Sequence, residues 1–174
     1  DEPQDLKFSG EPTQLVIGER NVFREGVTIH RSATLDEATI IGNDNFFMAN
    51  SHAAHNVQVG NHVTLANGVL LAGHVIIEDR VFMGGNAVVH QFTRVGEMAI
   101  FQGISGCSLD IPPGTILAGV NRLAGLNLVG LKRGGIGPEE RKLLKTFYKS
   151  ILTDRVPLDE AIEQAGVTEE TAPP

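Results

Sequence analysis

Apolar residues recur along most of this chain with a period of six. When the chain is divided into blocks of six from Val16, the second residue is apolar in sixteen consecutive blocks, from Ile17 to Cys107. A helix repeats its apolar residues every three or four positions, and a β-sandwich spaces its strands by about 8–12 residues with variable loops. A strict period of six instead predicts a solenoid of short strands that turns a corner after each block.

Two other positions of the repeat have a fixed character. The sixth position is small or β-branched in these blocks: Val27, Ala33, Val57, Val63, Val69, Val75, Val81 and Ala87. Glycine recurs at the third position: Gly18, Gly42, Gly60, Gly84 and Gly96. We interpret these glycines as corner residues, because a corner favours a backbone that tolerates unusual φ angles.

The repeat resembles that of the hexapeptide-repeat proteins, many of which are acyltransferases. The resemblance implies a left-handed parallel β-helix in which three blocks form a triangular coil of about 18 residues. We therefore predict an all-β fold, a left-handed parallel β-helix with a short C-terminal α-helical region.

The limits of the repeat divide the chain into four predicted segments. They are a lead-in loop over 1–15, the parallel β-helix over 16–117, a Gly-rich connector over 118–137 and C-terminal helices over 138–174.

The last of these segments carries two helix signals. Pro138 suits the first turn of a helix, and an apolar face follows it: Leu143, Leu144, Phe147, Tyr148, Ile151 and Leu152. Pro157 starts a second short helix with Gly166 as its expected stop, and we expect residues 171–174 to be frayed.

Composition and charge exclude several classes of protein. Apolar residues form 41% of the chain, too many for a disordered chain, and they form no run long enough to span a membrane. A net charge of −7 argues against nucleic-acid binding. The single cysteine, Cys107, excludes an internal disulfide framework and suits a reducing compartment. No signal-peptide pattern opens the chain, and we interpret its start at Asp1, without methionine, as a sign of trimming.

The histidines are not spread evenly over the coils. On a strict coil of about 18 residues, four of the six fall on one side of three successive coils (His52, His55, His74 and His90), and two fall elsewhere (His30 and His62). Gly73 and Gln91 share the coil position of His55.

Clustered imidazoles serve either metal binding or acid–base catalysis. Carbonic anhydrases of this fold bind zinc through three histidines, two of them four residues apart. The pair here, His52 and His55, is three residues apart, which favours acid–base chemistry and no metal.

The motifs around these histidines closely resemble one family in their order. The family is that of the acyl-carrier-protein–UDP-N-acetylglucosamine O-acyltransferases, which begin lipid A biosynthesis. The runs that carry the resemblance are QDLK (4–7), TIHR (28–31), NSHAAHN (50–56), LAGHV (71–75), AVVHQF (87–92) and GLKR (130–133).

The resemblance implies that a 3-hydroxyacyl group moves from the phosphopantetheine thioester of acyl carrier protein to the 3-hydroxyl of UDP-N-acetylglucosamine. His55 matches the general base, Asn56 the residue that orients it, and the N–H of Gly73 the donor to the thioester oxyanion. The residues that match substrate-binding positions are Asp5 and Lys7 in the lead-in loop, His52, His74, His90 and Gln91 on the coils, and Asn127 and Arg133 in the nucleotide-binding segment.

The resemblance also implies partners and a location. We expect a cytoplasmic homotrimer with its active sites between subunits, no resident cofactor, no metal, no nucleic-acid partner and no membrane span. The stretch from Arg122 to Arg155 holds eight basic and three acidic residues, a net +5, and the remainder holds six and eighteen, a net −12. We interpret the basic stretch as a docking surface for the acidic carrier protein.

Several departures from the family leave alternatives open. Asn56 stands where relatives often have aspartate, Gly134 where they often have a second arginine, and Val129 where they have a polar residue. Relatives also carry additional N-terminal coils, so we interpret the chain as truncated or as a shortened member. The alternatives are an N-acylating or acyl-CoA-dependent relative acting on an amino-sugar nucleotide, a zinc hydratase of the carbonic anhydrase kind, and a catalytically silent solenoid.

Overall fold

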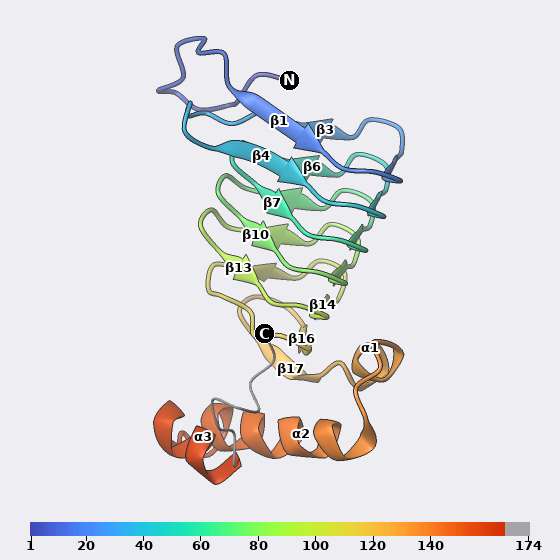
Figure 1. The fold of residues 1–174 in the computed structure, drawn as a ribbon, viewed down its shortest axis with the longest axis vertical. Coiled ribbons are helices and arrows are strands. Elements are labelled where there is room, and N and C mark those ends of the chain that lie inside the picture. Colours follow the sequence, from blue (N-terminus) through green and yellow to red (C-terminus); the bar gives the residue numbers. More distant parts are fainter. Residues whose placement is uncertain (166–174) are drawn as a thin grey trace. The chain divides into compact units, whose positions relative to one another are not determined.

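The computed structural model describes residues 1–165, which form two compact units that divide after Asn127. The first unit is a stack of coils in which each short strand pairs in parallel with the equivalent strand one coil away (Figure 1). The strands form three sheets, one for each face of the coil. The predicted parallel β-helix with a C-terminal helical region is therefore confirmed.

Each sheet takes every third strand of the chain, except at the C-terminal end of the second sheet, where β16 and β17 follow β14. The first holds β1 (Gln14–Ile17), β4 (Ala38–Ile41), β7 (Gln58–Val59), β10 (Ile76–Ile77) and β13 (Arg94–Val95). The second holds β2 (Val22–Phe23), β5 (Phe46–Phe47), β8 (Thr64–Leu65), β11 (Phe82–Met83), β14 (Ile100–Phe101), β16 (Thr115–Leu117) and β17 (Leu123–Leu126). The third holds β3 (Thr28–Ile29), β6 (His52–Ala53), β9 (Leu70–Leu71), β12 (Val88–Val89) and β15 (Gly106–Cys107).

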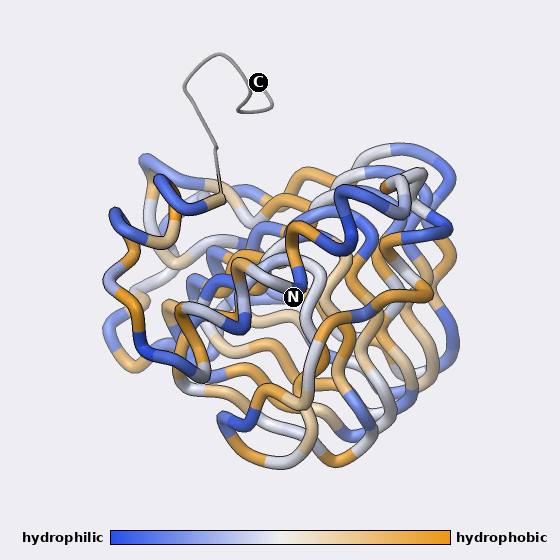
Figure 2. Tube along the Cα trace, turned by 90° about the horizontal axis from the view of Figure 1, so that it is seen from below, coloured by the Kyte–Doolittle hydropathy of each residue, from blue (hydrophilic) through white to orange (hydrophobic). Residues whose placement is uncertain are grey.

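Two positions of the six-residue repeat build the core. Every second-position residue from Ile41 to Cys107 is at most 4% exposed, and the sixth-position residues from Val57 to Ala87 are at most 1% exposed. The repetition of apolar stretches from coil to coil is visible in Figure 2. Ile17 and Phe23, in the coil of β1–β3, are 43% and 38% exposed because that coil has a neighbour on one side only in the described chain.

The third-position glycines are required for a different reason from the one predicted. None of the five has a positive φ. Each lies close against the next coil instead: a Cβ on Gly84 would lie 2.6 Å from the backbone nitrogen of Gly103, and one on Gly96 would lie 2.6 Å from that of Pro113. The glycines therefore allow close stacking of the coils rather than sharp corners.

The corners that need left-handed backbone lie at the fifth position of the repeat. Positive φ angles recur there in these residues: Arg20, Gly26, Asp44, Asn50, Asn56, His62, Gly68, His74, Arg80, Asn86, Phe92, Met98 and Ile104. Asparagine and glycine adopt this conformation easily, and the stacked coils impose it on the others.

The first coil is longer than the others by one block of the repeat. Gln14 pairs with Ala38, four blocks further along the chain, whereas Ile40 pairs with Gln58, three blocks further along. The additional block lies in the segment 32–37, which contains no strand and leaves Leu35 68% exposed. Leu35 is thus not the core residue that the repeat predicts, because its block is inserted outside the regular coil.

The stretch 118–137, predicted as a connector, contains regular structure. β17 pairs antiparallel with β16, and α1 (Leu128–Arg133) follows it. Antiparallel pairing becomes possible here because the chain reverses after Leu117 instead of continuing around the coil.

The second compact unit consists of α1, α2 (Pro138–Leu152) and α3 (Leu158–Ala165). Pro138 occupies the first turn of α2, and the N–H of Gly137 donates to the side chain of Glu140. Within the predicted apolar face, Leu143 and Leu152 are exposed, at 44% and 48%. The predicted helix stop at Gly166 and the frayed end lie outside the described residues.

Candidate active site

The third sheet carries the histidines on its strands and on the corners that follow them. His52 lies in β6, His55 follows the same strand, His74 follows β9 and His90 follows β12. Since His52 pairs with Leu70 and Leu70 with Val88, residues that are three blocks apart lie above one another on successive coils. His55 therefore stacks on Gly73, and the N–H of His74 donates to the carbonyl of His55.

The imidazole of His55 is held in one tautomer by Asn56. His55 Nδ1 lies 3.0 Å from Asn56 Oδ1, which also accepts a 2.9 Å hydrogen bond from the backbone N–H of Ala33. Because a backbone N–H can only donate, that atom of Asn56 is the amide oxygen, and Nδ1 of His55 must carry the proton. Nε2 is left with its lone pair, which is the state that a general base requires.

The inserted segment 32–37 fixes the other end of the Asn56 amide. Asn56 Nδ2 donates to Glu37 Oε2 at 2.7 Å, to Ser32 Oγ at 2.8 Å and to Thr34 Oγ1 at 3.2 Å. Asn56 is 4% exposed and Ser32 is fully buried. The inserted block, which breaks the repeat, therefore builds the support beneath His55.

Gly73 lies directly against the ring of His55. A Cβ at this position would lie 2.7 Å from His55 Cε1 and 2.8 Å from Nε2. The N–H of Gly73 forms no hydrogen bond within residues 1–165, so it can donate to a bound molecule. A lone pair on His55 and an unpaired N–H on Gly73 thus lie side by side.

His74 completes an aromatic arrangement around His55. Its ring meets that of His55 edge to face with centroids 5.3 Å apart, and stacks on Phe92 at 4.8 Å. His74 Nδ1 also lies 3.8 Å from Glu37 Oε2. Neither Phe92 nor Glu37 is predicted from the sequence. Phe92 occupies the position of His74 one coil further along the chain, and this coil spacing is the signal that identifies it.

His30 belongs to the same cluster, although a strict coil of three blocks places it elsewhere. Its ring meets that of His52 with centroids 4.8 Å apart, and it is 4% exposed. The prediction is wrong because the first coil has four blocks, which shifts His30 onto the face of the other histidines. Burial lowers the pKa of both rings, and in His30 the neighbouring His52 lowers the pKa further. Thr28 Oγ1 lies 2.7 Å from His52 Nδ1 and orients that ring.

His90 and Gln91 lie beside a groove rather than within the ring cluster. Both are exposed, and His90 Nδ1 lies 3.3 Å from the carbonyl of Gln91. The groove has a volume of about 550 Å³ and runs along the third sheet past these residues: His52, Leu70, Leu71, Ala72, Val88, Val89, His90, Gly106, Cys107, Ser108 and Val120. It leads from two histidines across a mostly apolar surface. Burial raises the pKa of Cys107 to about 12, so its thiol stays neutral.

The other predicted site residues lie in three separate places. Asp5 and Lys7 form one turn, in which the N–H of Lys7 donates to Asp5 Oδ1 at 2.9 Å. This lead-in segment is attached to the coil near His30, where the N–H of Arg31 donates to the carbonyl of Asp1. Asn127 is the last residue of the first compact unit, and its Nδ2 donates to the carbonyl of Met98. Arg133 ends α1 in the second unit.

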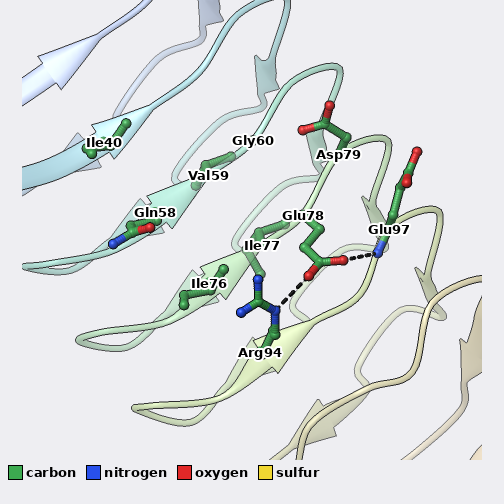
Figure 3. A pocket seen from close by; sticks show the side chains of 10 residues that line it. All are labelled: Ile40, Gln58, Val59, Gly60, Ile76, Ile77, Glu78, Asp79, Arg94 and Glu97. Atoms are coloured by element: carbon green, nitrogen blue, oxygen red, sulfur yellow. Dashed lines mark hydrogen bonds and ion pairs between the residues drawn. The ribbon is translucent and has the colours of Figure 1, made fainter. Parts of the chain in front are cut away.

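A second groove lies on the first sheet, away from the histidines. It has a volume of about 450 Å³ and is lined by residues of β4, β7, β10 and β13 and the corners that follow them (Figure 3). Its central charges are paired: Arg94 Nε donates to Glu78 Oε1 at 2.6 Å, and Glu78 Oε2 accepts from the N–H of Glu97. With its charges satisfied internally and no histidine in its lining, this groove is not part of the candidate site.

The described part of the chain contains neither a metal-binding cluster nor a membrane-spanning helix. Over residues 1–165, no group of three or more His, Cys, Asp or Glu residues is arranged to hold a metal ion. The same residues contain no helix that is both long enough and apolar enough to cross a bilayer.

Comparisons with known proteins identify relatives of this chain. A family model described as UDP-N-acetylglucosamine O-acyltransferase, domain 2, matches residues 110–173, and a bacterial transferase hexapeptide model matches residues 38–73. The solved UDP-N-acetylglucosamine acyltransferase of Bacteroides fragilis is 34% identical with a TM-score of 0.87, over 98% of this chain and 69% of that one. The chain belongs to the UDP-N-acetylglucosamine acyltransferase family. The fold prediction, including the left hand of the β-helix, is thereby confirmed.

Two further relatives of this acyltransferase family define the extent of the match. The structure from Francisella novicida is 36% identical with a TM-score of 0.91, over 98% of this chain and 65% of that one. The acyl-[acyl-carrier-protein]–UDP-N-acetylglucosamine O-acyltransferase of Anaeromyxobacter sp. (strain Fw109-5) is 45% identical over 93% of this chain. The chain spans 64% of that relative's length.

Proposed function

We propose that this acyltransferase moves a 3-hydroxyacyl group from acyl carrier protein to the 3-hydroxyl of UDP-N-acetylglucosamine, the first step of lipid A biosynthesis. Membership of the family and the names of its relatives support the substrates. The observation that carries the proposal is the His55 ring, protonated at Nδ1 toward Asn56, lying against the unpaired N–H of Gly73.

The reaction uses this geometry in two steps. His55 Nε2 takes the proton of the sugar hydroxyl as the hydroxyl oxygen bonds to the thioester carbon, and the resulting oxyanion accepts the hydrogen bond of the Gly73 N–H. The intermediate then expels the phosphopantetheine thiolate, which receives the proton from the imidazolium. An ester forms, a thiol is released, and no covalent bond to the protein is made.

The remaining site residues hold the substrates. His52, His74, His90 and Gln91 position the sugar and diphosphate, and Asp5 and Lys7 reach the sugar from outside the coil. Asn127 and Arg133 are assigned to nucleotide binding, and the active sites lie between neighbouring subunits of a homotrimer.

The apolar groove on the third sheet receives the acyl chain. Its lining includes His52, His90 and Ala72, which precedes Gly73 in the chain, and continues over Leu70, Val88 and Val120. Leu70 is 47% exposed and Val88 is 44% exposed, and both side chains line the groove. A bound alkyl chain would cover them.

The donor and the location follow from the same proposal. No resident cofactor is required, because the acyl group arrives on the carrier protein's phosphopantetheine. The net +5 between Arg122 and Arg155 supports docking of that acidic protein. We place the protein in the cytoplasm, because carrier-bound acyl groups and nucleotide sugars are both available there.

The test is a transfer assay with purified protein, a 3-hydroxyacyl carrier protein and labelled UDP-N-acetylglucosamine. We expect a monoacylated product whose acyl bond is cleaved by mild alkali, as an ester is and an amide is not. An alkali-stable product, or transfer from acyl-CoA alone, would replace the proposal with one of the related acyltransferase activities. If no transfer occurs, and the protein binds stoichiometric zinc and hydrates carbon dioxide, the zinc hydratase alternative would replace the proposal.

A further inference from the structure

Glu37 connects the inserted segment to two histidines of the site. Its Oε2 accepts the 2.7 Å hydrogen bond from Asn56 Nδ2 and lies 3.8 Å from His74 Nδ1. We infer that Glu37 is a positioning residue, which through the neutral amide of Asn56 supplies the negative charge that stabilises protonated His55. The inference rests on the proposed function only because it takes His55 to be the general base.

The amide of Asn56 can transmit this charge because both its ends are occupied. Nδ2 has two protons and three acceptors, of which Glu37 is the nearest and the only ionised one. A charged acceptor forms a stronger hydrogen bond than a hydroxyl and polarises the amide. Polarisation makes Asn56 Oδ1 a better acceptor for His55 Nδ1–H, and this favours both the observed tautomer and the imidazolium.

The other titratable groups near His55 oppose its protonation, and the negative charge of Glu37 offsets them. His30, His52 and His74 surround the site, and each adds a positive charge when protonated. Among residues 1–165, no carboxylate other than Glu37 lies within 4.0 Å of a ring nitrogen of these histidines. Glu37 is therefore the carboxylate that lies beside His74 and is linked to His55 through Asn56.

The position of Glu37 limits the size of the effect. Its side chain is 53% exposed, so solvent screens part of its field. Its action on His55 passes through one intervening amide, and its action on His74 is direct. We therefore expect removal of the Glu37 charge to have a moderate effect on His55 rather than to abolish the site.

The first test needs no catalytic activity. Nitrogen-15 chemical shifts of the His55 ring give its tautomer in the wild type, in Glu37→Gln and in the matched control Asp36→Asn. Glutamine keeps an oxygen that accepts from Asn56 and so preserves the fold. We expect Glu37→Gln to raise the fraction of His55 that is protonated at Nε2 instead of Nδ1, because a neutral acceptor polarises the Asn56 amide less than an anion does. Asp36→Asn removes the same charge from the adjacent exposed residue, and we expect it to leave His55 unchanged.

The second test uses the rate of transfer. In Glu37→Gln the acid limb of kcat/KM should move to lower pH, and kcat should fall by about threefold to tenfold, because a weaker base transfers the proton less readily. KM for the nucleotide sugar should stay constant. The double variant Glu37→Gln with Asn56→Asp returns a negative charge next to His55, and the acid limb should return to the wild-type pH or above.

The outcomes separate this inference from the proposed function. An inactive wild type would refute the transferase proposal and still leave the His55 tautomer to be measured. An active wild type whose Glu37→Gln variant keeps the same pH profile and the same His55 tautomer would refute the inference alone. A shift of equal size in Asp36→Asn would also refute it, because the effect would then belong to general surface charge.

Discussion

His55 occupies the space that a side chain at residue 73 would need. A Cβ on Gly73 would lie 2.7 Å from His55 Cε1 and 2.8 Å from Nε2. The two residues lie on successive coils, and the ring of His55 therefore requires glycine at position 73.

Replacing Gly73 with alanine should displace the His55 ring. We expect kcat for acyl transfer to fall by about a hundredfold or more, because a shift of the base by about 1 Å is enough for such a loss. The measurement is steady-state transfer with a hydroxyacyl carrier protein.

The matched control is Gly85→Ala, where a new Cβ would lie 3.5 Å from the carbonyl oxygen of Asn67, an ordinary contact. This variant should keep at least half of the wild-type rate. Equal losses in the two variants would mean that any added methyl group on the coil impairs transfer, and the specific relationship between Gly73 and His55 would be wrong.

Removing the imidazole of His55 should remove general-base catalysis. We expect His55→Ala to lose at least about a hundredfold in kcat, the lower end of what a general base contributes. His62→Asn is the control, because His62 is exposed and its left-handed backbone suits asparagine. Activity near the wild type in His55→Ala would contradict the mechanism.

The periodic part of the fold can be predicted from the sequence, because burial is decided residue by residue along a regular repeat. Phe47, Leu65 and Phe101 are fully buried at the positions that the period of six assigns to the core. The glycine column was predicted for the wrong reason: Gly84 has no positive φ and instead lies against the coil of Gly103. A repeat shows where a side chain must be absent without showing which contact excludes it.

The candidate site could be predicted only where it follows the repeat. The regular coil of three blocks places His55 against Gly73, and the structure agrees. One inserted block shifts every residue before it, so the strict repeat places His30 on the wrong face, and it gives no indication of Glu37. The hydrogen bond from Asn56 to Glu37 depends on how an irregular segment folds back, which a periodic pattern does not encode.

Neighbouring leucines on β9 should separate stability from substrate binding. Leu71 is fully buried, so Leu71→Ala should lower the free energy of unfolding by about 2–5 kcal/mol, as large-to-small changes in a core do. Leu70 is 47% exposed along the groove, so Leu70→Ala should change stability by less than about 1 kcal/mol and raise KM for long-chain donors.

Denaturant unfolding and transfer assays on both variants measure the two effects. If Leu70→Ala destabilises the protein as much as Leu71→Ala, the outward and inward faces of the strand have been assigned wrongly. If it leaves KM unchanged for every chain length, the groove does not hold the acyl chain.

His30 and His52 should make stability fall in acid. Burial lowers the pKa of His30 and His52 below the ordinary value of 6.5, so the folded state favours their neutral forms. Well above pH 6.5 these rings are largely neutral in both the folded and the unfolded chain, and they do not lower stability. As the pH falls below 6.5, the unfolded chain binds protons first, and stability decreases until the pH reaches the lower folded-state pKa values.

Substitution of His30 tests this origin of the pH dependence. His30 is 4% exposed and its Nδ1 has no hydrogen-bond partner within residues 1–165, so His30→Phe keeps a ring in place and leaves no polar atom unsatisfied there. The urea midpoint of this variant should fall less than that of the wild type between pH 7.5 and pH 5, values chosen on either side of the ordinary histidine pKa of about 6.5. His62→Asn should follow the wild-type curve, because His62 is exposed. Parallel curves for His30→Phe and the wild type would show that His30 is not protonated on unfolding in this range, and the acid sensitivity would then have to come from other groups.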